Sequence, residues 1–264
     1  MPDTLNQPPA QKTDRQKEQG NNLVFSYMAL RNLIGFSGML LPIVLVVFTK
    51  ESNNKNIENS ISDYYYTSNG DMLVVLLSVL GVFLFTYRGY KFIEKLLLAL
   101  AAICAIGIAF SPTATNVVIS NEFFSVHTPN LEVAQFLGLE QHLIFAGTFF
   151  IAIALLSLFY FPKKSPGAPL KKADGNMTQK AKRNVVYKIC GWVMLASVLV
   201  LVLYFLVTPF KKALGDFPMI FVMETIAIEA FGISWITKGE TLFWEGEHYM
   251  KRAWRETTSA LKAG

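Results

Sequence analysis

Apolar residues along this chain gather in six long runs, which polar segments separate. A helix needs about 20 residues to cross the hydrocarbon core of a bilayer. The shorter runs reach this length with uncharged flanking residues, and the first run extends back towards Phe25. The pattern predicts an all-α fold, a polytopic membrane bundle of six transmembrane helices. The runs cover residues 33–48, 72–87, 96–110, 142–161, 189–210 and 217–237.

The composition and the positions of the charges fit this membrane fold. The chain is 52% hydrophobic and only 16% charged, whereas a soluble domain has about 25% charged residues. If both termini are cytoplasmic, 20 of the 24 Lys and Arg residues lie on the cytoplasmic side. This split follows the positive-inside rule, so we expect a multi-pass protein with both termini in the cytoplasm. The basic residues lie in loops without interleaved aromatic side chains, which argues against a nucleic-acid partner.

The chain outside the six runs includes two polar tails. Residues 1–22 hold almost no large apolar side chains, so we expect a disordered cytoplasmic tail. The six-helix domain then covers residues 23–238. The C-terminal tail, 239–264, carries apolar side chains at steps of three, four and seven residues, which share one face of a helix. This pattern predicts a cytoplasmic amphipathic helix that lies on the inner leaflet or packs on its own domain.

Three charged residues lie in or beside the apolar runs. Glu224 and Glu229 belong to the sixth run, and Arg31 lies two residues before the first. A carboxylate near the middle of a bilayer costs about 2.5–3.5 kcal/mol on insertion scales unless it is paired or protonated. Arg31 matches Glu229 in predicted depth, so we predict a structural ion pair between them. Two alternatives stay open: Glu229 relays a proton or contacts a substrate, or Arg31 extends to the headgroups.

The stretch SISDYYYTSNGD, residues 60–71, precedes the second run on the predicted outer face. Its three tyrosines are typical of the interfacial belt of a membrane, and Asp71 fits the positive end of the second helix. A second interpretation joins the stretch to the loop 111–141, which has no Lys or Arg and is expected to carry a short helix over 131–139. The candidate ligand-binding residues of this outer polar pocket are Asp63, Tyr65, Asp71, His127, His142 and Glu224.

Histidines and carboxylates on one face are also ligand types that zinc takes. The chain holds three histidines, with no His-x-x-x-His pair and no His-Glu-x-x-His motif, so no metal and no cofactor is assigned. Cys104 and Cys190 both lie in apolar runs and are expected to pack as small apolar residues. The sequence has no glycine-rich phosphate loop and no Gly-x-Ser-x-Gly elbow, so no catalytic residue is assigned.

Several stretches together resemble a known type of protein. They are RNLIGFSGMLLP, SISDYYYTSNGD followed by GVFLFTYRGY, HTPNLEVAQF and FGISWITKGE. The chain resembles uncharacterised bacterial six-helix integral membrane proteins, and its arrangement is loosely similar to the DRAM/Frag type. The resemblance implies placement in a bacterial inner membrane and no established reaction. The outer histidines are also similar to the ceramidase and adiponectin-receptor type of hydrolase, although the chain lacks that group's paired histidines in a late helix.

These observations lead to three hypotheses for the function. The first is a non-enzymatic protein that binds a lipid or small amphiphile in the outer pocket, with membrane lipids as its partners. The second is a metal-dependent membrane hydrolase that uses the same outer Asp, His and Glu residues. The third is a proton-coupled secondary transporter built around Glu224 and Glu229. We carry the first forward, and the sequence leaves the oligomeric state open.

Overall fold

The computed structural model describes residues 22–49, 57–67, 70–87, 89, 91–111, 113, 135–136, 139–162, 170–171, 175–239 and 241–243. These residues are mainly helical, and their two named strands have two residues each. The elements are α2 (Asn22–Phe48), η1 (Ser62–Tyr66), α3 (Gly70–Thr86), α4 (Phe92–Phe110), β1 (Gln135–Phe136), β2 (Leu139–Glu140), α5 (Gln141–Leu155), η2 (Leu156–Tyr160), α6 (Gln179–Leu206), α7 (Thr208–Leu214) and α8 (Met219–Lys238).

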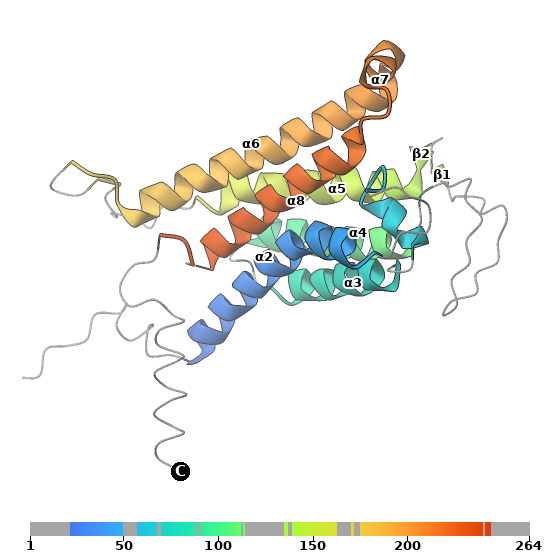
Figure 1. Cartoon of the computed structure of the whole chain (residues 1–264). Helices are drawn as coiled ribbons and strands as arrows, with labels where there is room; N and C mark the ends of the chain where they lie inside the picture. Colours follow the sequence, from blue (N-terminus) through green and yellow to red (C-terminus); the bar gives the residue numbers. More distant parts are fainter. Residues whose placement is uncertain are drawn as a thin grey trace, which may run out of the picture.

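The long helices follow the order of the predicted apolar runs and alternate in direction (Figure 1). The end of α8 lies beside α2 about ten residues after α2 begins, where Arg31 Nη1 donates a hydrogen bond to the Lys238 carbonyl at 3.2 Å. We call this side of the bundle the Lys238 end. At the opposite side, the Phe221 N–H donates to the Asn59 carbonyl at 2.9 Å. Because η1 lies there, we call it the η1 end.

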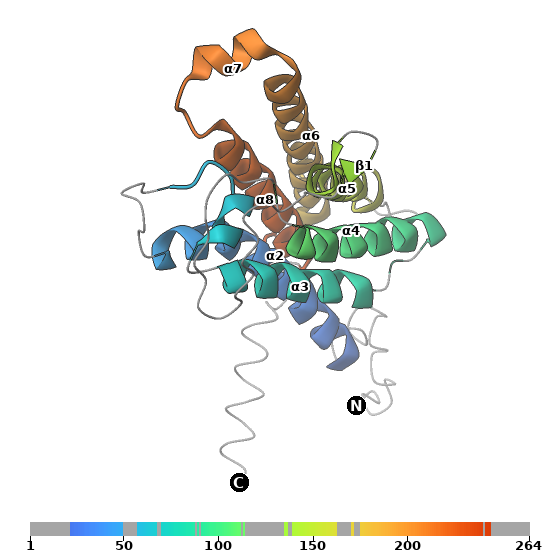
Figure 2. The same ribbon diagram turned by 90° about the vertical axis from the view of Figure 1, so that its right-hand side faces the viewer.

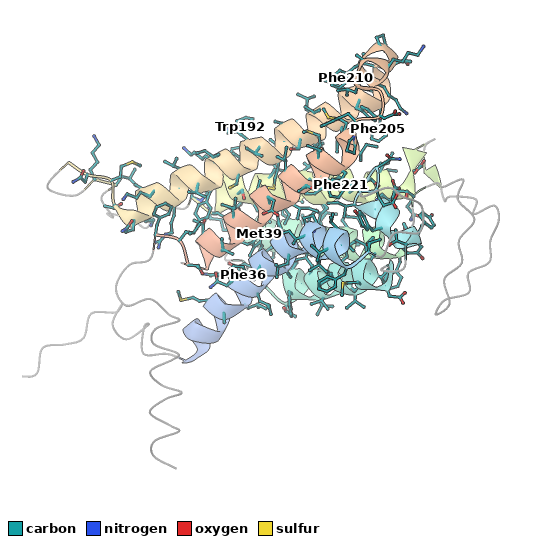
Figure 3. The ribbon with its side chains drawn as sticks, in the orientation of Figure 1. Phe36, Met39, Trp192, Phe205, Phe210 and Phe221 are labelled. Atoms are coloured by element: carbon teal, nitrogen blue, oxygen red, sulfur yellow. The ribbon has the colours of Figure 1, made fainter. Side chains whose placement is uncertain are left out.

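Five of the described helices are long and apolar enough to cross a membrane. They are α4, α6, α8, the part Met28–Phe48 of α2, and α5 continued through η2. The helix α3 is also apolar but has only 17 residues. The outer surface carries exposed apolar side chains such as Trp192 on α6 and Phe36 on α2 (Figure 3). Broad exposed apolar surface marks contact with lipid or with partners, so the fold is consistent with a multi-pass membrane protein.

The predicted run 189–210 divides into two helices in the structure. The helix α6 begins earlier, at Gln179, because the Thr178 hydroxyl caps it by accepting from Ala181 N at 3.2 Å. Pro209 explains why α6 ends at Leu206: its ring would clash with a carbonyl one turn back, and it has no N–H to donate. Proline is tolerated in a first turn, so it starts α7. This short helix projects at the far ends of α6 and α8 (Figures 1 and 2).

The short helix predicted over 131–139 is not formed by its described residues. Gln135 and Phe136 instead pair with Glu140 and Leu139 as an antiparallel ladder just before α5. A nine-residue segment is too short to form a stable helix without tertiary packing. Local pairing of the chain with itself satisfies the backbone groups here.

Glycine allows α2 and α8 to approach closely. A Cβ atom on Gly35 would lie 2.9 Å from the Gly232 carbonyl oxygen and from the Ile236 nitrogen. A Cβ on Gly232 would lie 2.8 Å from the Gly35 oxygen. Close backbone approach through small residues is a common way to pack helices in membranes. These two helices form one half of the scaffold, onto which α3 packs through α2 and α6 packs through α8.

The core contains an aromatic cluster near the Lys238 end. The fully buried Trp235 packs edge-on against Tyr87 and Phe161, with ring centroids 5.0 and 5.5 Å apart. A buried hydroxyl pair, Ser157 of η2 and Ser234 of α8, joins these two helices by a hydrogen bond of 2.5 Å. Edge-to-face rings and a satisfied polar pair both favour one fixed arrangement of the helices.

The C-terminal tail does not continue α8 as a helix in the described residues Thr241–Phe243. Phe243 has φ of 56°, in the left-handed region, and its carbonyl accepts from Arg183 Nη1 at 3.0 Å. The tail helix predicted over 239–264 therefore does not begin at Gly239. The rest of that prediction, 244–264, and the disordered tail predicted for residues 1–21 lie outside the described residues.

Candidate functional site

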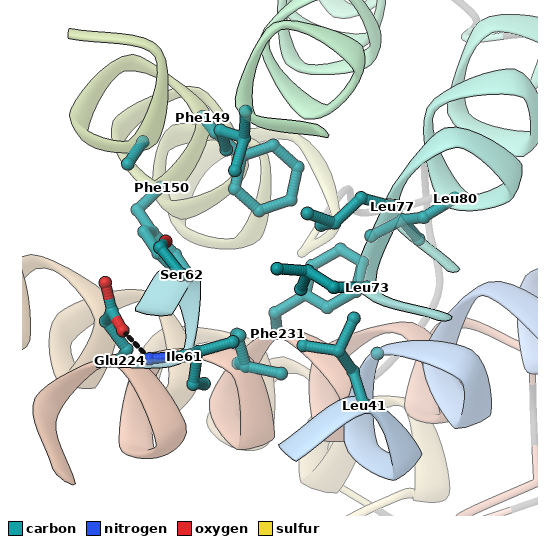
Figure 4. A pocket seen from close by; sticks show the side chains of 14 residues that line it. Leu41, Ile61, Ser62, Leu73, Leu77, Leu80, Phe149, Phe150, Glu224 and Phe231 are labelled. Atoms are coloured by element: carbon teal, nitrogen blue, oxygen red, sulfur yellow. Dashed lines mark hydrogen bonds between the residues drawn. The ribbon is translucent and has the colours of Figure 1, made fainter. Parts of the chain in front are cut away.

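The 3₁₀ turn η1 contains the three consecutive tyrosines and closes one end of the bundle. The Ser60 hydroxyl accepts from the Asp63 N–H at 3.0 Å and starts the turn. The Ile61 N–H donates to Glu224 Oε2 of α8 at 2.7 Å (Figure 4). A 3₁₀ turn has poor hydrogen-bond geometry of its own, so these contacts and the Phe221–Asn59 bond fix its position.

The three tyrosines of η1 have different surroundings. Tyr64 is 1% exposed and packs against Phe221 with ring centroids 6.2 Å apart. Tyr65 and Tyr66 are half-buried and meet edge to face at 5.2 Å. The Tyr66 hydroxyl donates to the Thr113 carbonyl. The pKa of Tyr66 is raised to about 12, mainly because the side chain is buried. The predicted interfacial role therefore does not apply to Tyr64, because this ring fills the core beneath η1.

His142 of α5 lies in the first helical turn and is 3% exposed. Its Nε2 lies 2.7 Å from the Ser62 hydroxyl oxygen, and its Nδ1 lies 2.6 Å from the Ser111 carbonyl oxygen. A carbonyl oxygen only accepts, so in the neutral ring Nδ1 must carry the proton. Nε2 then has a free lone pair, and the Ser62 hydroxyl donates to it. The histidine thus connects η1 to the end of α4.

Asp63 lies next to this pair in η1 and is half-buried. Its Oδ1 accepts from the Thr113 hydroxyl at 3.4 Å. Burial raises the pKa of the Asp63 carboxyl group, and the hydrogen bonds from Ser60 and Thr113 and the charge of His142 oppose this rise. Asp63 and Glu140 both interact electrostatically with the His142 ring. A positive charge on the ring would therefore interact with two carboxylates.

A cavity of about 50 Å³ lies beneath η1, inside the bundle (Figure 4). Its wall is apolar on most sides, and its polar side chains are Ser62 and Glu224. Such a cavity holds more than one water molecule but is smaller than an engineered cavity of about 150 Å³ that binds benzene. The apolar lining comes from Gly38, Leu41, Ile61, Leu73, Leu77, Leu80, Ile108, Ala146, Phe149, Phe150, Ile228 and Phe231.

The structure brings three of the six predicted binding residues to η1. Asp63 is part of the turn, His142 bonds to its first residue, and Glu224 bonds to the residue before it. Of these three, Glu224 lines the cavity. Ser62, which the sequence reasoning missed, also lines the cavity and bonds to His142. The sequence signal for Ser62 was its position beside Asp63, because a buried hydroxyl group there needs a hydrogen-bond partner.

The other three predicted binding residues lie elsewhere or are not described. Tyr65 belongs to η1 but is not part of the cavity lining. Asp71 is exposed in the first turn of α3, the predicted position, where the helix dipole favours a carboxylate. His127 lies outside the described residues. The outer residues therefore separate into a group around η1 and a helix-end carboxylate.

The predicted ion pair involves a residue at the Lys238 end of the bundle. Arg31 Nη1 donates to the Lys238 carbonyl, and the Arg31 guanidinium lies over the Tyr87 ring at 5.5 Å. Glu229 lies nine residues before Lys238 along α8, which corresponds to about 13 Å of helix rise. Glu229 is half-buried. These contacts hold the Arg31 side chain at the C-terminal end of α8. The pairing of Arg31 with Glu229 stays a prediction.

Within the described part of the chain, no three His, Cys, Asp or Glu residues lie close enough to hold a metal ion. The metal-dependent hydrolase hypothesis needs at least three such ligands around one ion. His142 uses both ring nitrogens in hydrogen bonds to Ser62 and Ser111. The described geometry therefore offers a hydroxyl–imidazole pair rather than a metal centre.

Comparisons with protein families, with curated proteins and with solved structures give no match to this chain. The functional argument therefore depends on the residues and geometry of the η1 end.

Proposed function

We propose that this is a bacterial inner-membrane protein with six spans and cytoplasmic termini, which binds a small amphiphile at its outer face. The apolar part of the ligand enters the cavity beneath η1, and its polar group faces Ser62 and Glu224. The observation that carries the proposal is the lining of that cavity, in which apolar side chains surround two polar ones. Binding sites for small molecules commonly combine an apolar wall with a few placed polar groups.

The topology rests on three lines of support. The long helices alternate in direction, and α2 and α4 run the same way. The helix α3 therefore returns the chain across the bundle between them, as a sixth span would. Seventeen residues of α3 rise about 25 Å, and a short span is accommodated by local thinning of the bilayer. The basic residues lie mainly in the segments at the Lys238 end of the helices, which favours a cytoplasmic position for that end.

The size of the cavity limits the ligand. A volume of about 50 Å³ suits a slim, short apolar chain or the end of a longer chain. Burying each methylene group of such a chain contributes about 0.8 kcal/mol. A single-chain amphiphile therefore fits better than a bulky ring system. The Glu224 carboxyl group can hydrogen-bond a hydroxyl or amide headgroup next to the chain.

The test is binding of a hexyl-chain dansylamide to the full-length protein in lipid nanodiscs, measured by fluorescence against empty nanodiscs. Ala146→Leu places extra bulk in the cavity lining. The matched control, Ala196→Leu, adds the same bulk to the exposed face of α6. We expect saturable binding that Ala146→Leu weakens by about tenfold or more, a loss of about 1.4 kcal/mol, and that Ala196→Leu leaves unchanged. Equal affinity in both variants, or no saturable binding above empty nanodiscs, would contradict the proposal.

A further inference from the structure

We infer that Ser62 is a nucleophile and His142 its general base, acting on the ester group of a short-chain amphiphile bound in the cavity. The inference rests on the proposed function, because it uses the same cavity, and it adds a reaction to binding. Its basis is the contact of 2.7 Å between Ser62 Oγ and His142 Nε2, in a pair whose serine also lines the cavity.

The hydrogen-bond direction favours proton transfer from serine to histidine. The Ser111 carbonyl holds Nδ1 in its protonated form at 2.6 Å, so Nε2 presents its lone pair to the Ser62 hydroxyl. A serine hydroxyl is a weak nucleophile until an adjacent base accepts its proton. The third member that orients the base is here a backbone carbonyl, in the place that a carboxylate takes in many serine hydrolases.

Nearby carboxylates offset part of the cost of the buried charge that the reaction creates. When Nε2 accepts the proton, the ring becomes a cation, and the carboxylates of Asp63 and Glu140 interact with it electrostatically. Ser62 and His142 are 8% and 3% exposed, so little bulk water screens this interaction. Asp63 is thus a positioning and charge-stabilising residue, which acts through His142 and does not contact the substrate.

The reaction balances without a metal or redox partner. Ser62 Oγ attacks the ester carbonyl carbon and its proton passes to His142 Nε2. The carbon–oxygen bond to the alcohol then breaks, and His142 returns the proton to the departing alcohol oxygen. A water molecule attacks the resulting acyl-serine, gives its proton to His142, and releases the acid as Ser62 recovers its proton. The apolar acyl chain occupies the cavity in each step, which fixes the carbonyl beside Ser62.

The docking of η1 explains why the serine is held in place. The neighbouring Ile61 N–H bonds to Glu224, and the following residue, Asp63, bonds to Ser60. Both contacts flank Ser62 on its own turn. A reacting group held by its neighbours in the sequence loses little freedom in the transition state, which favours reaction.

The test is covalent labelling of the full-length protein in nanodiscs with a butyl fluorophosphonate, followed by intact mass and peptide mapping. The serine oxygen replaces fluoride on phosphorus, and the proton leaves with fluoride as hydrogen fluoride. We expect one adduct per chain on Ser62, none in Ser62→Ala, and labelling about 100-fold slower or more in His142→Gln. The control Ser197→Ala removes a buried hydroxyl of α6 outside the cavity lining, and labelling should be unchanged.

A second variant guards against misfolding of the first. Ser62→Cys places a thiol beside His142, and we expect iodoacetamide to modify it faster than the buried Cys104 and Cys190. Adding His142→Gln should remove this difference. An unreactive introduced thiol in a folded Ser62→Cys protein, labelling at another residue, or labelling at an unchanged rate in His142→Gln would each overturn the inference.

A separate measurement distinguishes this inference from the proposed function. The probe is a neutral butyl phosphonate diester, which has no leaving fluoride. If the diester binds saturably and competes with the dansylamide while the fluorophosphonate does not react, the nucleophile is disproved and amphiphile binding stands. If neither compound binds nor reacts, both conclusions are overturned. Labelling of Ser62 that the diester blocks supports both.

Discussion

The two ends of the bundle use polar and aromatic residues in different ways. At the Lys238 end, the rings of Tyr87, Phe161 and Trp235 pack together. Two cations, Arg31 and Lys238, lie over ring faces at 5.5 and 4.9 Å. At the η1 end, carboxylate, imidazole and hydroxyl groups hold a short 3₁₀ turn above a cavity.

The difference shows how each end of the bundle is held together. The Lys238 end joins helix to helix through large apolar contacts, which stabilise the bundle in proportion to the surface they bury. The η1 end joins a non-helical segment to helices through individual hydrogen bonds, each worth about 1 kcal/mol. The first arrangement stabilises the fold, and the second borders a cavity. Variants at the two ends should therefore separate stability from local order.

The largest expected effect is at the Lys238 end, with Trp235→Ala. Removing a fully buried tryptophan should lower the free energy of unfolding by about 3–5 kcal/mol, because three aromatic neighbours lose their partner. Thermal unfolding in detergent measures the change. Trp192→Ala is the control, since that side chain is 64% exposed on α6. Similar losses in both variants would contradict the assignment of the core.

The next effect is at the contact between α2 and α8. Gly35→Ala places a methyl group 2.9 Å from backbone atoms of α8, so the helices must separate. Overpacking of this kind costs about 1–3 kcal/mol. Gly147→Ala adds the same group to α5, where nothing lies within 4 Å, and should not destabilise. The same unfolding assay compares them, and an equal midpoint for both proteins would argue against the close approach.

A smaller and more local effect is expected at the η1 end from Glu224→Ala. The Ile61 N–H loses its acceptor, and an unsatisfied buried group costs about 1–3 kcal/mol. Because η1 is held by few contacts, we expect the turn to loosen while the bundle stays folded. Hydrogen–deuterium exchange should rise in peptides covering 57–67 and remain unchanged in α8 around Trp235. Unchanged exchange in 57–67 would show that Glu224 does not hold the turn.

The smallest effect concerns Asp63 and its dependence on pH. Burial raises the pKa of the Asp63 carboxyl group above its ordinary value of 3.8. The stabilising contribution of this group is therefore present below that value and is lost as pH rises through the folded-state pKa. Asp63→Asn removes the charge, so its unfolding midpoint relative to wild type should be higher at pH 7 than at pH 4. A difference of the opposite sign would mean that the carboxylate is stabilised in the fold.

The helices could be predicted from the sequence because an apolar run of membrane length has few alternatives to a helix. The run 217–237 becomes α8, Met219–Lys238, and 72–87 becomes α3, Gly70–Thr86. The division into α6 and α7 depended on a single proline inside an otherwise apolar run. Hydrophobicity alone does not report such a break, whereas the clash of the proline ring with the preceding turn does.

The candidate site could be predicted only in part from the sequence, because its contacts join segments far apart in the chain. Asp63, His142 and Glu224 were selected by their predicted depth in the membrane. The bonds of His142 to Ser62 and of Glu224 to Ile61 span 80 and 163 residues. They depend on how a five-residue 3₁₀ turn docks, which no periodic pattern encodes. The same limit applied to Tyr64, whose burial follows from that docking.

The most direct test of the amphiphile cavity is photo-crosslinking with a six-carbon alcohol that carries a diazirine in its chain. The full-length protein in nanodiscs is irradiated, and the modified residues are mapped by peptide mass spectrometry. The proposal predicts saturable labels on lining residues such as Leu77 and Phe149, which excess unlabelled alcohol removes and which Ala146→Leu lowers. Labels confined to exposed side chains such as Trp192 and Leu199, unaffected by competitor, would contradict it.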